Sequence, residues 1–154
     1  MQEIWQKKLW LIVMAVVWAV LAAGCEGDAQ QAQLADLTEF YNLSLPSGDW
    51  RQQGTNIWAP VREQEVLTDV RIWLVRLEDC TQEAAEKQLQ DEGYAELSEK
   101  PGYWQKQADA LQYQTRLVVE KQNCWLVCSC WPEEDNVWAE QLAAALASFE
   151  LVQE

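Results

Sequence analysis

The strongest structural signal in the chain lies in residues 111–131, whose sequence is LQYQTRLVVEKQNCWLVCSCW. In its first half, apolar residues at every second position alternate with glutamine and arginine, which predicts a strand with one buried face. The polar residues 121–123 then predict a hairpin turn. The second half, residues 124–131, is apolar on both faces, so it predicts a strand that is covered on both sides. Together these residues predict a long hairpin inside a sheet.

Two helices are predicted, one before this hairpin and one after it. Thr81 is a suitable N-cap and Gly93 a natural C-terminal stop, so the first helix is expected from about residue 82 to residue 92. The second helix is expected after Asp135 or Asn136, because apolar residues then recur at helical spacing and would form one buried stripe. That stripe contains Trp138, Leu142, Leu146 and Phe149.

The segments between these elements predict short strands. Their residues either alternate between apolar and polar or are rich in β-branched and aromatic types. The strands are expected within residues 41–45, 56–59, 66–77 and 102–104. This order of elements predicts an α+β domain in which two helices pack against a mostly antiparallel sheet.

The N-terminus has the composition of an export signal. Lys7 and Lys8 precede the uncharged apolar residues 9–23, a run that is short for a membrane-spanning helix. The small residues of Ala22-Ala23-Gly24 follow, and then Cys25. We therefore expect residues 1–24 to be removed as a signal peptide. Cleavage near Ala23 or an uncleaved anchor are the alternatives.

The segment that ends in Cys25 resembles the lipobox of bacterial lipoproteins. That resemblance implies that the Cys25 thiol carries a diacylglycerol and that the chain is cut just before it. Ala22 stands where such motifs usually have leucine, although alanine is tolerated there. The expected organisation is then a signal peptide at residues 1–24, a lipidated cysteine and polar tether at 25–33, and one α+β domain at 34–154.

The expected domain also resembles the PsbP-like group of folds. The resemblance rests on the early segment LSLPSGDW at residues 43–50, the strand leading into a helix, the long hairpin and the closing helix that ends in Ala-Ser-Phe at residues 147–149. It implies an α-β-α sandwich that serves as a binding or assembly module. The group has no common catalytic site, so the fold does not carry a function with it.

Composition excludes several classes of function. The chain has 11 basic and 25 acidic residues, a net charge of −14, and no histidine. Removing Glu3, Lys7 and Lys8 with the signal leaves 9 basic and 24 acidic residues, or about −15, which repels nucleic acid. Without histidine there is no Ser-His-Asp triad, no HExxH site and no imidazole zinc ligand. We expect no cofactor and no enzymatic activity.

Four cysteines besides Cys25 allow three interpretations. They are Cys80, Cys124, Cys128 and Cys130. They can be small core residues, they can form disulfides in an oxidising compartment, or they can form a redox or metal site, for which their spacing is poor. The last three share one strand face, and Cys128 and Cys130 have parallel side chains, so a disulfide between those two is disfavoured. The best single pairing joins Cys80 to one of the three.

Aromatic residues outside the patterned elements form the other candidate site. Trp50, Trp58 and Trp104 are predicted to lie in turn or irregular segments and to be exposed. If they cluster, they form a ligand patch that includes Tyr103 at its rim, together with Asp49 and Arg51. Exposed indole rings bind flat ligands such as sugars or anchor protein partners. Trp125 and Trp138, by contrast, lie on patterned faces and are predicted to be core residues.

These observations predict a non-catalytic lipoprotein of the cell envelope. It would be extracytoplasmic, anchored by the lipid on Cys25 to the cell membrane, or to the outer membrane where there is one. Its partner would be an unidentified envelope protein. A small ligand or glycan held by the exposed tryptophans is the first alternative, and a thiol-based redox or metal-binding protein is the second.

Overall fold

The computed structural model describes residues 37–153, so the predicted signal, Cys25 and the tether lie outside the described residues. Within this part the helices are α3 (Gln82–Asp91) and α4 (Val137–Ser148). The strands are β1 (Tyr41–Asn42), β2 (Trp50–Gly54), β3 (Ile57–Arg62), β4 (Glu65–Val66), β5 (Arg71–Leu77), β6 (Ala95–Glu96), β7 (Tyr103–Ala108), β8 (Leu111–Glu120), β9 (Asn123–Pro132) and β10 (Glu150–Leu151). The predicted α+β fold, with a mostly antiparallel sheet and two helices, is confirmed.

The large sheet has eight strands in the order β2-β3-β5-β9-β8-β7-β6, with β4 paired to the outer part of β3. Every neighbouring pair is antiparallel. The predicted hairpin is its centre, because β8 and β9 pair along their full length from Leu111↔Pro132 to Glu120↔Asn123. The first and last strands, β1 and β10, form a separate two-stranded ribbon.

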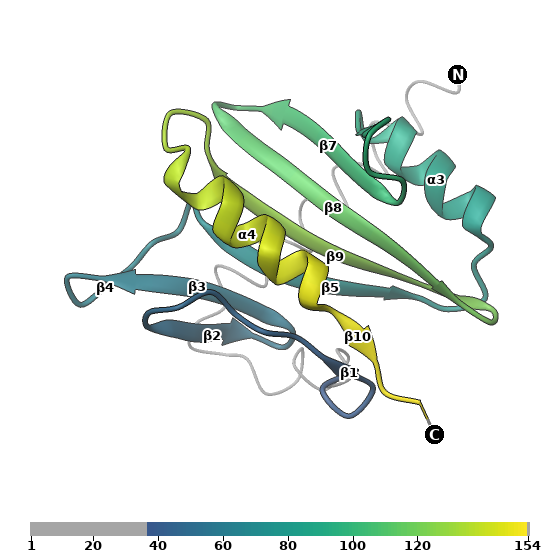
Figure 1. Cartoon of the computed structure of the whole chain (residues 1–154), viewed down its shortest axis with the longest axis horizontal. Helices are drawn as coiled ribbons and strands as arrows, with labels where there is room; N and C mark the ends of the chain where they lie inside the picture. The colour runs from purple at the N-terminus through teal and green to yellow at the C-terminus, as the bar shows by residue number, and fades with distance from the viewer. Residues whose placement is uncertain (1–36, 154) are drawn as a thin grey trace, which may run out of the picture. The chain divides into compact units, whose positions relative to one another are not determined.

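Strand β9 is covered on both faces, as its apolar sequence predicted. On one face, Trp125 and Val127 pack with Leu146 and Phe149 from the C-terminal end of the chain. On the other face, Leu126 and its neighbours pack with Ala85 and Leu89 of α3. Successive strand residues point to opposite faces, so the two helices lie on opposite sides of the sheet. Figure 1 shows α4 running across the strands on one of these sides.

The two helices differ in how their ends are capped. The Thr81 hydroxyl accepts a hydrogen bond from the backbone N–H of Ala84 at 3.2 Å, which confirms it as the N-cap of α3. Gly93 follows that helix with a φ of 94°, a conformation that glycine adopts readily. Asn136 is the N-cap residue of α4, so the helix begins where it was expected, although the Asn136 side chain makes no capping hydrogen bond.

Two strand predictions need correction. The segment 66–77 was expected to be one strand, but it is divided between β4 and β5 because the polar residues Thr68 and Asp69 form a bend. The alternation at residues 41–45 predicted a longer strand than the two residues of β1. There the chain leaves its only partner, β10, after Asn42, so the following alternation has no ladder to join.

Candidate functional site

The four aromatic residues predicted to form an exposed patch do not come together. Trp104 is 3% exposed and Tyr103 is 8% exposed, whereas Trp50 and Trp58 are half-buried. Tyr103 and Trp104 are consecutive in β7 and point to opposite faces of the sheet, and packed side chains cover both faces at that point. The prediction that these two residues are exposed is therefore wrong.

The two half-buried tryptophans pack against one core cluster, which contains Trp138. Trp50 meets the ring of Trp138 edge-on at a centroid distance of 6.1 Å, so it extends the core beneath α4. Trp58 meets Tyr41 edge-on at 6.5 Å. It also lines a hollow of about 250 Å³ whose other walls are Thr38, Tyr41, Asn42, Leu43 and Leu45. Both rings are therefore half-buried extensions of the core and do not form an exposed patch with Tyr103 and Trp104.

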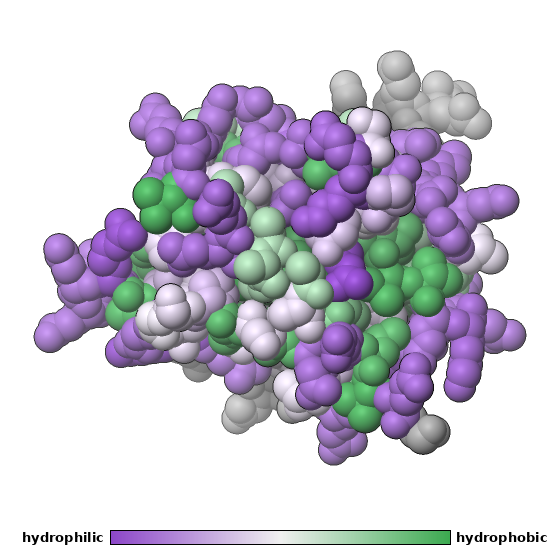
Figure 2. Space-filling model, in the orientation of Figure 1, coloured by the Kyte–Doolittle hydropathy of each residue, from purple (hydrophilic) through white to green (hydrophobic). Residues whose placement is uncertain are grey.

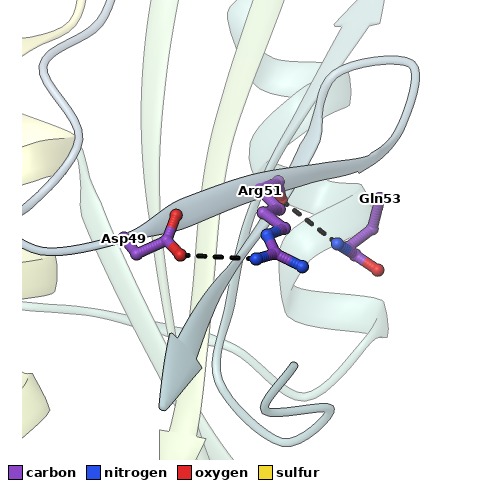
Figure 3. Close-up of polar contacts among 3 residues, drawn as sticks. All are labelled: Asp49, Arg51 and Gln53. Carbon is purple, nitrogen blue, oxygen red and sulfur yellow. Dashed lines mark hydrogen bonds and ion pairs between the residues drawn. The ribbon is translucent and has the colours of Figure 1, made fainter. Parts of the chain in front are cut away.

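The predicted rim of the patch is a polar sheet edge. An Arg51 Nη2 atom lies 3.6 Å from Asp49 Oδ2, and Gln53 Nε2 donates a hydrogen bond to the Arg51 carbonyl at 3.4 Å (Figure 3). The side chains of Arg51 and Asp49 are 57% and 60% exposed, so their ion pair contributes little stability. Charged side chains on an edge strand do, however, discourage pairing with another chain.

The four described cysteines are free thiols, three of them buried and Cys80 half-buried. Cys124, Cys128 and their neighbours pack in the apolar cluster beneath α3, which agrees with the interpretation of the cysteines as core residues. Burial raises the pKa of Cys128 to about 12. Burial also raises the pKa of Cys124 to about 11, and the adjacent Cys80 thiol adds to that shift. Both thiols therefore hold their protons at neutral pH, which makes them poor nucleophiles.

The face of the sheet that α3 partly covers carries a second group of aromatic and cationic side chains. The register places Arg71 of β5, Cys130 of β9, Tyr113 of β8 and Lys106 of β7 side by side across four strands. Trp73 is two residues beyond Arg71 and so lies on the same face. We call Arg71, Trp73, Lys106 and Tyr113 the cation–aromatic cluster.

The members of the cation–aromatic cluster touch one another and all are half-buried. The rings of Trp73 and Tyr113 meet edge-on at 6.4 Å with an interplanar angle of 86°. The Arg71 guanidinium carbon lies 5.7 Å from the centre of the Trp73 ring, and Lys106 Nζ lies 5.0 Å from the centre of the Tyr113 ring. These are distances at which a cation is attracted to a ring face.

The cations of the cluster retain free hydrogen-bonding capacity. Within residues 37–153 neither Arg71 nor Lys106 forms an ion pair, although Lys106 Nζ donates to the Glu92 carbonyl at 3.4 Å. The charges of Asp69 and Asp109 reach this region. Burial is the largest cause of the raised pKa of Tyr113, and the Asp109 charge also raises it. Burial is likewise the largest cause of the raised pKa of Cys130, and the Asp69 charge also raises it. The cluster therefore combines ring edges, donors and nearby acceptors in one place.

Sequence reasoning missed the cation–aromatic cluster for an identifiable reason. The alternation of residues 111–119 correctly placed Tyr113 on a buried strand face. Only the strand order shows that Arg71 and Lys106 flank it, because β5 and β7 are far apart in the sequence. The one available signal was the presence of cations at strand positions in a strongly acidic chain.

Comparisons with known proteins give no family for this chain. No protein-family model matches the sequence, and no curated protein is significantly similar to it. In the described residues, no helix has the length and apolar character needed to span a membrane. The same residues contain no group of three or more cysteines and carboxylates placed to hold a metal ion. The fold and the cation–aromatic cluster are thus the basis for a functional proposal.

Proposed function

We propose that this protein is a lipid-anchored, extracytoplasmic binding module that performs no chemistry and binds a saccharide through the cation–aromatic cluster. The observation that carries the proposal is the cluster itself, in which two aromatic rings share one sheet face with two cations that form no ion pair within residues 37–153. The N-terminal segment that ends in Cys25 supports the anchored location. The acidic character of the chain is compatible with a body held away from anionic headgroups.

A saccharide matches the chemistry of the cluster better than a hydrocarbon or a nucleic acid. The faces of sugar rings pack against aromatic side chains, and their hydroxyls need both donors and acceptors. Arg71 and Lys106 supply donors, and Asp69 and Asp109 supply carboxylates nearby. The net charge of −14 opposes any polyanionic ligand.

The opposite side of the domain gives less support for a large partner. Figure 2 views the side on which α4 lies, where hydrophilic residues surround the outline and hydrophobic residues form several separate groups. Protein interfaces usually have a contiguous apolar centre inside a polar rim. The cation–aromatic cluster on the other sheet face is therefore the better candidate for specific recognition.

We further propose that the domain is an α-β-α sandwich of the PsbP-like group. The position of α3 and α4 on opposite sheet faces supports this, as do the long β8–β9 hairpin and the closing helix. The proposal concerns architecture alone, since such folds host different functions.

Replacing Cys25 with alanine is expected to abolish lipid attachment. In the producing bacterium, the wild-type chain should incorporate a labelled fatty acid and remain with the membranes after a high-salt wash, because two or three acyl chains anchor stably. The Cys25→Ala chain should lose the label. The matched control is Cys80→Ala, which should keep it. A wild-type chain without label, or label retained by Cys25→Ala, contradicts the lipoprotein proposal.

Saccharide binding is expected to depend on the cluster and not on the predicted patch. The probes are neutral oligosaccharides of β-linked glucose and N-acetylglucosamine, titrated into the detergent-solubilised full chain while tryptophan fluorescence is followed. Trp73→Ala and Tyr113→Ala should each weaken binding at least tenfold, or ~1.4 kcal/mol. The control Trp50→Phe should bind like wild type.

Two results would contradict the saccharide proposal. The first is a wild-type chain that leaves its fluorescence unchanged with every oligosaccharide of the panel. The second is equal weakening by Trp50→Phe and Trp73→Ala, which would move the ligand to the other sheet face. Capture of a defined envelope protein that competes with no saccharide would favour the protein-partner alternative.

A further inference from the structure

The thiols of Cys80 and Cys124 lie against each other where β5 leads into α3. Cys124 Sγ donates a hydrogen bond to the Cys80 carbonyl oxygen at 3.2 Å. The Cys80 N–H donates in turn to the carbonyl of Gln122 at 2.8 Å. The two thiols also interact directly, since the pKa of Cys124 is raised by the Cys80 thiol as well as by burial. The backbone of Cys80 is therefore held beside the start of β9.

We propose that Cys80 and Cys124 are an oxidisable pair that forms an internal disulfide by exchange with an external disulfide. Cys124 Sγ already lies 3.2 Å from the Cys80 carbonyl oxygen, and the Cys80 N–H is bonded to the carbonyl two residues before Cys124, so we expect closure to require rotation of the side chains rather than movement of a strand. The inference does not depend on saccharide binding or on lipidation.

The same geometry excludes the other pairings. Cys124 and Cys128 are four residues apart in β9, which separates their Cα atoms by roughly 13 Å. Cys128 and Cys130 are two apart on one strand with parallel side chains, so their sulfur atoms cannot adopt the required dihedral angle without distortion. Cys130 Sγ instead donates a hydrogen bond to the Asp69 carbonyl oxygen at 3.8 Å, six residues along β9 from Cys124. Among the described cysteines, the hydrogen bonds bring Cys80 and Cys124 together.

The exposure of the two thiols sets the order of the reaction. Cys80 is half-buried, whereas Cys124 is 0% exposed, so an external disulfide RSSR meets Cys80 first. The Cys80 thiolate attacks one sulfur of RSSR, which forms a mixed disulfide and releases RS⁻. Cys124 then gives its thiol proton to a released RS⁻, and its sulfur attacks the neighbouring Cys80 Sγ, which expels the second RS⁻; the closeness of the two thiols offsets the low thiolate fraction of Cys124. The two thiol protons end on the two released RSH molecules, and RSSR is reduced as the pair is oxidised.

The bond would fasten the N-terminus of α3 to the central strand of the sheet. Cys80 directly precedes the N-cap Thr81, and Cys124 is opposite Leu77 in the β5–β9 ladder. The closed loop spans a sequence separation of 44 residues, which includes α3, β6, β7 and β8. Closing a loop of that length restricts the unfolded chain strongly.

The test uses the detergent-solubilised full chain, incubated with oxidised or reduced glutathione and then alkylated before any reductant is added. Trypsin should release a cross-linked pair of fragments, residues 77–87 with residues 122–154. Chymotryptic cleavage after Trp125 then separates Cys124 from the two later cysteines and locates the bond. The oxidised chain should also denature ~10 °C higher than the reduced chain.

Cysteine variants distinguish an internal Cys80–Cys124 disulfide from simple modification of an accessible Cys80 thiol. Cys124→Ala should trap a stable glutathione adduct on Cys80, and Cys80→Ala should leave Cys124 unmodified and lose the thermal shift. Cys128→Ala, which also alters a buried thiol, should still form the cross-link. A stable adduct on wild-type Cys80, a bond to Cys128 or Cys130, or four free thiols in oxidised glutathione would overturn the proposal. The comparison of denaturation temperatures in oxidised and reduced glutathione uses the wild-type chain alone, so it tests the proposal without relying on the folding of any variant.

Discussion

Trp125→Ala is expected to lower the free energy of unfolding by ~3–5 kcal/mol, which is the usual range for removing a large aromatic residue from a core. Trp125 is 1% exposed and lies in the central strand β9. Its ring centre is 5.9 Å from that of Phe149 and 6.2 Å from that of Tyr41. The Arg76 guanidinium carbon also lies 5.3 Å from the ring. The substitution therefore empties the junction between the sheet, the end of α4 and the β1–β10 ribbon.

Urea denaturation followed by circular dichroism measures this effect. The matched control is Trp50→Ala, which removes the same side chain from the half-buried edge strand and should cost less than half as much. Val137→Ala, at a residue that is 65% exposed, should change stability by no more than ~0.5 kcal/mol. Because domains of this size are stable by only ~5–15 kcal/mol, wild type and all variants are compared at the same reduced temperature. Equal costs for Trp125→Ala and Trp50→Ala would show that the junction is not the centre of the core.

Arg116→Met is expected to cost ~2–3 kcal/mol, because it removes charged hydrogen bonds from carbonyls at the C-terminal end of α4 and just beyond it. Arg116 Nη1 lies 2.9 Å from the Leu146 carbonyl oxygen, 3.2 Å from that of Ala147 and 3.0 Å from that of Phe149. Its guanidinium carbon is also 5.7 Å from the Tyr103 ring centre. The positive charge therefore stabilises the C-terminal end of α4, where the helix dipole is negative.

The control for Arg116 is another arginine with a different environment. Arg51→Met removes an exposed ion pair with Asp49 and should change stability by less than ~0.5 kcal/mol. Methionine retains most of the apolar stem of arginine, so the difference between the two variants reports the guanidinium contacts. Arg116→Lys should fall between wild type and Arg116→Met, since an ammonium can reach fewer of the carbonyls. Equal losses for Arg51→Met and Arg116→Met would rule out the capping contribution.

The hairpin and the closing helix could be predicted because their signals are local. Alternation along β8 and the four-residue spacing along α4 each depend only on neighbouring residues, and both elements lie where expected. The same holds for Thr81, whose capping bond is made within one helical turn. The pairing of β1 with β10 has no such signal, because it joins residues more than one hundred positions apart.

The binding surfaces could not be predicted because they depend on strand order. Trp104 was expected to be exposed, yet the Tyr94 and Leu117 side chains pack in the same cluster and cover it. Conversely, Tyr113 lies on the strand face where it was expected, but it is half-buried beside cations supplied by β5 and β7, which its sequence pattern did not indicate. A sequence pattern gives the face on which a residue lies, but it does not give the neighbours on the adjacent strands.

The long β8–β9 hairpin separates two different features of the domain, one near each of its ends. The β1–β10 ribbon joins the core beside Trp125, near the Glu120–Asn123 turn. The cation–aromatic cluster surrounds Cys130, roughly 17 Å further along the same strand. Strands β1 and β10, near the two ends of the described residues, therefore lie side by side at one end of the sheet (Figure 1), and the cluster lies further along β9. A fluorescent protein fused after the C-terminus would extend from the end that carries β10, whereas one inserted at the Asp109–Ala110 turn would crowd the end that carries the cluster.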